Sequence, residues 1–131
     1  MGRLNDKLFY DFNLHKLGYD FMGYTFDSKK ELSYHHIKTK QQKGKTTYEN
    51  GAILNRITSH NYIHVIEAYE YELFKEISEE LKREHKDGIT KEHLQTIRQI
   101  LEYFECKYKD TQTKNGVLIV KEDFVRRRIQ L

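Results

Sequence analysis

The chain has 131 residues, of which 37% are hydrophobic and 33% are charged, with a formal net charge of +3 at pH 7. This length predicts one soluble domain, residues 1–131, and the ten tyrosines and seven phenylalanines exclude a disordered tail because they supply a core. No apolar run approaches the ~18 residues of a membrane span, and the N-terminus lacks the apolar stretch of a secretion signal. We therefore expect a cytoplasmic protein that does not contact a membrane.

The single cysteine, Cys106, excludes an internal disulfide and a zinc site built from cysteines. It falls in a helical pattern, where a free thiol commonly packs as a small apolar side chain. The pattern therefore predicts a half-buried Cys106.

The first half of the chain predicts short elements. Aromatic residues dominate positions 1–30, where glycines interrupt them, and this pattern predicts turns and irregular elements around a core. Residues 31–37 (ELSYHHI) and 51–57 (GAILNRI) each predict a short strand. The lysine-rich stretch 38–50 between them shows no apolar period and predicts a loop.

The second half shows helical periodicity. Thr58 or Ser59 is a candidate N-cap for a helix that ends at Gly88, and Thr90 is a candidate N-cap for the next helix. The apolar residues that keep helical spacing in these two segments are Ile63, Ile66, Leu73, Ile77 and Leu81, then Leu94, Ile97, Leu101 and Phe104. The Asn-Gly pair in residues 113–124 predicts a terminal hairpin or an added strand. Together these elements predict the α+β class.

Four of the seven histidines form two pairs: His35 and His36 lie in the first predicted strand, and His60 and His64 lie in the first turns of the helix that begins at Thr58 or Ser59. His60 and His64 are one helical turn apart, so they project from one face and can share a divalent cation, with a third ligand from elsewhere. His35 and His36 are adjacent on a strand and point to opposite faces. One of them can therefore ligate the metal while the other remains a free base, which an imidazole with a pKa of ~6.5 can be near neutral pH.

The loop between the strands offers a backbone bridge and positive charge. The amide of Asn50, just before the second strand, can bridge backbone groups across the loop and so hold the strand that carries His36. The four loop lysines suit a phosphodiester, because most protein contacts to nucleic acid are to phosphate. These four are Lys38, Lys40, Lys43 and Lys45. A lysine cluster can equally be a solvated surface, and Asn50 can equally be a turn residue.

The segments LSYHHI, ENGAIL and SHNYIH resemble the HNH endonucleases, also called ββα-metal or His-Me finger nucleases, in their colicin-DNase form. The resemblance covers roughly residues 31–66 and implies a ββα-metal core at about 31–68. Residues 1–30 would then form an aromatic N-terminal extension, and residues 69–131 a C-terminal appendage of helices and short β structure.

The resemblance implies a role for each motif position. His35, His60 and His64 correspond to metal ligands, His36 corresponds to the general base, and Asn50 to the residue that orders the loop. The implied reaction is metal-dependent hydrolysis of DNA phosphodiesters that yields a 5′-phosphate and a 3′-hydroxyl. Double-stranded DNA is the expected substrate and RNA stays open, as does action as a homodimer or with a protein partner.

Two features depart from related patterns. Many HNH enzymes carry two CxxC pairs that bind a structural zinc, whereas this chain has only Cys106. Colicin-type enzymes place an acidic residue two positions before the histidine pair, and here that residue is Ser33. Arg56, or the neighbouring Lys29 and Lys30, are therefore candidates for a phosphate contact.

Several alternatives stay open from the sequence. One divalent ion is implied, but Zn, Ni, Mn and Mg are all candidates, although three imidazoles suit Mg least. A catalytically idle ββα-metal module that binds nucleic acid or a protein is the main alternative function, and a structural metal site in a partner-binding protein is another. The consecutive residues Arg126, Arg127 and Arg128 fit either a DNA-facing arm or a solvated tail.

Overall fold

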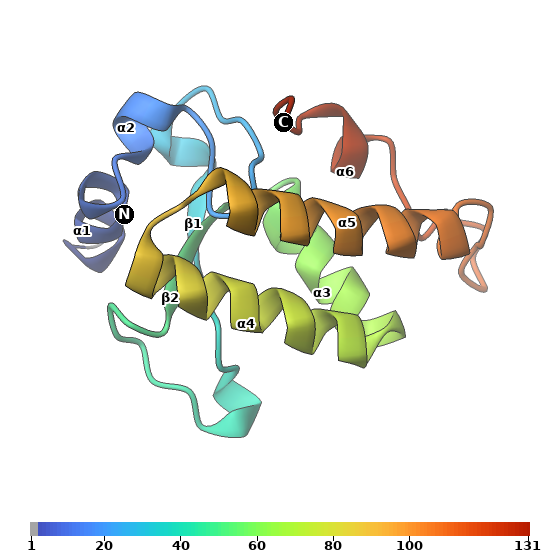
Figure 1. Ribbon diagram of the computed structural model, residues 1–131. Coiled ribbons are helices and arrows are strands. Elements are labelled where there is room, and N and C mark those ends of the chain that lie inside the picture. The colour runs from blue at the N-terminus through green and yellow to red at the C-terminus, as the bar shows by residue number, and fades with distance from the viewer. Residues whose placement is uncertain (1–2) are drawn as a thin grey trace.

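The computed structural model describes residues 3–131, so Met1 and Gly2 of the predicted domain range lie outside the described residues (Figure 1). In chain order the elements are α1 (Arg3–Asp11), α2 (Leu14–Leu17), the 3₁₀ turn η1 (Lys29–Glu31), β1 (Leu32–His36), the 3₁₀ turn η2 (Lys40–Gln42), β2 (Gly51–Asn55), α3 (Ser59–Tyr69), α4 (Tyr71–Asp87), α5 (Lys91–Tyr108) and α6 (Asp123–Arg126). This mixture of helices with one antiparallel sheet agrees with the predicted α+β class. Within residues 3–131, no helix has both the length and the apolarity needed to cross a bilayer.

The two predicted strands form an antiparallel pair. His36 lies opposite Gly51 at the loop end of the sheet, and Leu32 lies opposite Asn55 at the other end. All five β2 residues are buried, because helices cover this strand, whereas buried and half-buried residues are mixed along β1. Gly51 is required here, since a Cβ at this position would stand 2.2 Å from the ring of Tyr34.

The prediction of one continuous helix from 59 to 87 is wrong, because the segment forms two helices, α3 and α4, that are separated at Glu70. This residue adopts φ −143° and ψ 73°, and its carboxylate accepts hydrogen bonds from the Tyr108 hydroxyl (2.7 Å) and the Lys107 ammonium (3.1 Å). Hydrophobic periodicity misses the break because both helices bury the same apolar stripe, from Ile63 through Leu81.

The boundary between α4 and α5 is confirmed. Gly88 ends α4 with a positive φ of 89°, a conformation that favours glycine. The Thr90 side chain caps α5 by accepting a hydrogen bond from the backbone N–H of His93 (3.2 Å). The two helices then run side by side in opposite directions (Figure 1). Cys106 is exposed on α5, contrary to the expected half-buried position, because Leu101 and Phe104 occupy the buried face.

The N-terminal region is more helical than predicted, with α1 and α2 in place of irregular turns. Leu8, Phe9 and Leu14 of these helices are buried in the same core as the β2 residues. Asn13, in the left-handed conformation (φ 57°), separates the two helices. A single turn residue does not predict that the segments on either side of it are helical.

The C-terminal segment forms a minimal hairpin rather than a strand, with one bridge between Gln112 and Leu118. Two of the three consecutive arginines make internal ion pairs. Arg127 pairs with Glu31 (2.7 Å), and Arg128, with 9% of its side chain exposed, pairs with Glu105 (2.7 Å). Only Arg126 of the three is exposed, so Arg127 and Arg128 belong neither to a DNA-facing arm nor to a solvated tail.

Candidate metal centre

Three histidines from two elements converge on one point. His35 of β1 and His60 and His64 of α3 each offer a ring nitrogen, and these three nitrogens lie within 4.8 Å of one another. The ring centroids are 5.2 Å apart for His35 and His60, 5.4 Å for His35 and His64, and 5.1 Å for His60 and His64. The three residues predicted as metal ligands are therefore brought together by the fold.

Local geometry explains the convergence. Alternation along β1 directs Ser33 and His35 toward α3, while one helical turn separates His60 from His64. The turn from β2 into α3 is held by the buried carboxylate of Asp20. This group accepts hydrogen bonds from the Asn55 N–H (2.8 Å) and the Ser59 hydroxyl (2.5 Å). A residue outside the motif thereby links the end of β2 to the start of α3.

His35 is the ligand most strongly prepared by its surroundings. It is 1% exposed, and within residues 3–131 its Nε2 has no hydrogen-bond partner. Burial, and then the nearby His60 and His64, lower the pKa of His35 to about 3. The imidazole is therefore neutral at pH 7 with a lone pair available, and an unpaired buried nitrogen costs free energy that a metal bond would recover.

His60 and His64 are each oriented by a second residue. The Ser33 hydroxyl lies 2.5 Å from Nδ1 of His60 and also donates to the Leu54 carbonyl (3.4 Å). Because the Ser33 proton points to Leu54, its Oγ accepts a hydrogen bond from Nδ1–H of His60, which leaves Nε2 of His60 as the ligating atom. Nδ1 of the exposed His64 lies 3.2 Å from a Glu67 carboxylate oxygen, an arrangement that fixes ring orientation in metal sites.

The electrostatics of this triad suit a divalent cation. Burial lowers the pKa of His60 to about 4, with the charge of His64 as the next cause. Neutral imidazoles bind Zn and Ni well and Mn more weakly. Three protein ligands leave coordination positions open for water or substrate, as catalytic sites require. The residues present therefore fit one metal ion.

His36 stands apart from the triad, as the strand pattern predicts. Its half-buried ring packs edge-on against Tyr34, with centroids 4.7 Å apart, and its Nε2 lies 2.8 Å from the Thr46 hydroxyl. Burial and the charge of Lys40 lower the pKa of His36, so its imidazole is neutral at pH 7. It can accept a proton there without being a ligand.

Asn50 bridges the loop as expected. Its side-chain amide donates to the carbonyls of Lys38 (3.0 Å) and Lys45 (2.8 Å), and its Oδ1 accepts from the Lys38 N–H (2.7 Å). Gly44 permits the same closure, because a Cβ there would stand 1.7 Å from the Lys38 carbonyl oxygen. The loop is therefore tied to the strand directly beyond His36.

The predicted cationic residues fall into two places. Lys38, Lys40, Lys43 and Lys45 are all exposed on the loop. Arg56 follows β2 at the opposite end of the sheet, where its Nε donates to the Lys30 carbonyl (3.0 Å). The loop therefore forms one cationic surface, and Arg56 does not extend it.

Sequence reasoning missed the residues that orient the histidines. From the sequence, Ser33 is notable only because an acidic residue is usual at that position. Ser33 is two residues before His35, so it lies on the same face of the strand and can reach His60. Glu67 is three residues after His64, a spacing that brings helical side chains together. Thr46 lies inside the loop, where periodicity carries no information.

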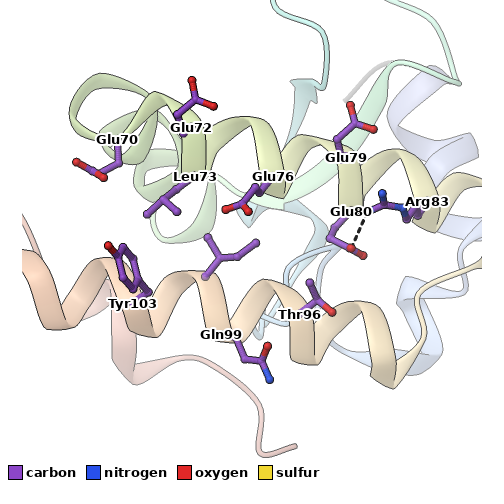
Figure 2. Close-up of a pocket in the computed structure, with 11 residues that line it drawn as sticks. Glu70, Glu72, Leu73, Glu76, Glu79, Glu80, Arg83, Thr96, Gln99 and Tyr103 are labelled. Atoms are coloured by element: carbon purple, nitrogen blue, oxygen red, sulfur yellow. Dashed lines mark hydrogen bonds and ion pairs between the residues drawn. The ribbon is translucent and has the colours of Figure 1, made fainter.

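A groove of about 740 Å³ lies between α4 and α5 (Figure 2). Figure 2 shows glutamates along the α4 side, including Glu72, Glu76 and Glu80, and Tyr103 on the α5 side. None of the motif histidines lines this groove. The acidic groove and the histidine cluster are therefore separate features.

The remaining three histidines have structural partners. Nε2 of His85 contacts the Gly51 carbonyl, and His93 contacts Glu80 and Asp87. His15 is exposed and packs beside the ring of Tyr10.

Comparison with protein-family models, with curated proteins and with solved structures finds no match to this chain.

Proposed function

We propose that this chain is a metal-dependent endonuclease of the HNH type, with a ββα-metal core formed by β1, β2 and α3. The observation that carries the proposal is the convergence of three imidazoles, one with a buried and unpartnered Nε2 within residues 3–131, beside a separate His36 whose pKa is lowered. His35, His60 and His64 would hold one divalent cation. When bound, the cation supplies charge stabilisation at the phosphate and at the departing 3′-oxygen.

The remaining chemistry belongs to the side chains of the chain. His36 accepts a proton from water as the water oxygen forms a bond to phosphorus and the bond from phosphorus to the 3′-oxygen breaks. The products are a 5′-phosphate and a 3′-hydroxyl, whose proton comes from solvent. Asn50 holds the loop beyond His36, and the loop lysines attract the phosphodiester backbone.

The test is cleavage of supercoiled plasmid with Mg, Mn, Ni or Zn, with and without a chelator. Wild-type protein is expected to nick or linearise the plasmid only with metal. His36→Ala is expected to lower the rate about 10²- to 10⁴-fold, the usual effect of removing a general base. His15→Ala serves as the matched control, since His15 is exposed and distant in sequence from the motif. Cleavage by His36→Ala at the wild-type rate would refute the assigned base.

One observation favours the alternative of a catalytically idle module that binds nucleic acid or a protein partner. Nε2 of His36 lies 2.8 Å from the Thr46 hydroxyl, and in the tautomer in which this hydroxyl donates to Nε2, the ring proton is on Nδ1 and no nitrogen is free to accept a proton from water. Thr46→Ala separates the two functions. An active nuclease should retain or gain activity on losing this contact, whereas an idle module should bind metal and DNA but cleave neither DNA nor RNA with any of the four metals.

A further inference from the structure

A pocket of about 290 Å³ lies between the start of the 38–50 loop and α4. Ile37 and Lys38 line it on the loop side, directly after His36. The Gln42 side-chain amide donates a hydrogen bond to the Tyr71 hydroxyl (2.5 Å) and so holds the loop against the helix. The volume is at the small end of the range for ligand pockets and suits a single planar group rather than a large molecule.

Helical spacing places one set of α4 side chains in this pocket. Tyr71, Lys75, Ser78 and Lys82 recur at intervals of three and four residues and therefore share a face of α4. Most of the acidic residues that line the groove in Figure 2 lie on another face of the same helix, and Glu79 lines both the groove and the pocket. The helix thus separates its charges, with its lysines toward the loop and most of its glutamates toward α5.

The interior of the pocket is apolar and aromatic. Phe74 and Ile37 are each 2% exposed and form the floor. Tyr71 is 41% exposed, and the Lys75 ammonium lies over its ring, 5.6 Å from the centroid, so a base that stacks on this face must displace the ammonium. Aromatic side chains in this state are the usual platforms for unpaired bases, because every base has a π-face.

Ser78 supplies an unsatisfied polar group. It is 8% exposed, and its Oγ has no hydrogen-bond partner anywhere in residues 3–131. A buried hydroxyl without a partner is uncommon because it loses hydration without compensation. A ligand in the pocket that carries hydrogen-bonding groups as well as an apolar face would satisfy it.

Three cations surround the pocket. Lys38 is exposed, and the side chains of Lys75 and Lys82 are 52% and 55% exposed. The last two pair with Glu72 (3.0 Å) and Glu79 (3.3 Å), but solvent-exposed pairs of this kind are weak, so a phosphate can compete for the lysines.

We propose that this pocket binds one unpaired nucleotide of the substrate strand, next to the bond that the metal centre cleaves. Its base would stack on Tyr71 above Phe74 and bond to Ser78, while its phosphates contact Lys38, Lys75 and Lys82. This proposal rests on the proposed endonuclease function, and it assigns the enzyme a preference for strands that are single or locally unpaired.

Binding is measured in a chelator, so that cleavage does not intervene, by the fluorescence anisotropy of labelled oligothymidylate and of a labelled duplex. The Lys75→Ala/Lys82→Ala variant is compared with Lys109→Ala/Lys114→Ala, which removes the same charge from exposed positions outside the pocket. The pocket variant is expected to lose about tenfold in affinity for oligothymidylate, with a salt slope shallower by about 1.4. An equal loss in the two double variants would overturn the proposal.

Two substitutions that leave the charge unchanged test whether the pocket binds a nucleobase. Tyr71→Leu is expected to weaken oligothymidylate binding about 5- to 100-fold, and Ser78→Ala about 2- to 10-fold, with smaller effects on the duplex. Tyr71→Phe keeps the ring and should stay within a few-fold of wild type. Equal losses for single strand and duplex would overturn base capture. Wild-type protein that cleaves DNA while these variants bind normally would refute only the pocket, whereas wild-type protein that neither binds nor cleaves would refute the function itself.

Discussion

Two clusters in this molecule contain buried or half-buried histidines, and their surroundings give them opposite properties. In the first, His35, His60 and His64 face one another, and burial lowers the pKa of His35 and of His60. In the second, His93 lies between the carboxylates of Glu80 (2.7 Å) and Asp87 (3.0 Å). Burial opposes a charge on His93, but the two carboxylates outweigh it and raise its pKa.

The difference shows how a fold assigns roles to identical side chains. His35 and His60, which burial and neighbouring imidazoles keep neutral, retain lone pairs for a metal. An imidazole that meets two carboxylates holds its protons as a hydrogen-bond donor, and His93 joins α5 to α4 in this way. The first cluster is thus suited to bind a ligand and the second to stabilise the helix pair.

The largest expected effect is on metal binding. His35→Ala should weaken the binding of Zn or Ni more than 100-fold and reduce metal-dependent cleavage to background, because it removes one of three ligands. His93→Gln should leave metal affinity within a factor of about two. Calorimetric titration of both variants measures the contrast. Equal metal affinity in wild type and His35→Ala would break the comparison.

A smaller effect is expected from the residues that orient the ligands. Ser33→Ala and Glu67→Gln should each lower metal affinity about 10- to 100-fold, the usual range for such partners. Ser33→Thr keeps the hydroxyl and should restore most of the loss. The same titration serves here, with circular dichroism to verify folding. Unchanged affinity in both variants would mean that the imidazoles are held by packing alone.

Acid should destabilise the metal-free protein through the first cluster. A folded-state pKa below the unfolded value of ~6.5 means that the stability is present above pH 6.5 and is lost as pH falls toward the folded value. For His35, with a folded pKa of about 3, the loss is about 2 kcal/mol between pH 6.5 and pH 5. Urea denaturation across this range measures it, and His35→Asn should show a shallower slope. Excess metal should reduce the loss in wild type.

The second cluster should respond with the opposite sign and a smaller size. A raised folded-state pKa means that the contribution of His93 is complete below pH 6.5 and is lost as pH rises through the folded value. His93→Gln should therefore destabilise the protein by about 1 kcal/mol at pH 6 and by less at pH 9. Urea denaturation at these two values is the measurement, and a deficit that grows with pH would contradict the assignment.

Part of the candidate site could be predicted because its spacing is local. The alternation of a strand already separates His35 from His36, and the turn of a helix already aligns His60 with His64. Asn50 could be placed for the same reason, since its hydrogen bonds reach only the two ends of its own loop. These rules need no knowledge of the rest of the fold.

Other features depend on contacts between distant segments. The break at Glu70 follows from hydrogen bonds to Tyr108 and Lys107 on α5, and apolar periodicity passes through it unchanged. Arg128 lies in the interior because it forms an ion pair with Glu105 there, although the three consecutive arginines predict an exposed basic tail. A pattern within ten residues carries no information about such partners.

The sequence by itself therefore determined the two strands, the boundary between α4 and α5, and the alignment of His60 with His64, while the choice of His35 over His36 came from the resemblance to the HNH motif. Only the tertiary structure decided that Nε2 of His35 is buried without a partner, that Ser33 and Glu67 orient the other two rings, and that His93 has carboxylates beside it. The physical reason is that spacing along the chain sets the direction of a side chain, whereas protonation and ligand strength depend on burial and on charges brought from elsewhere.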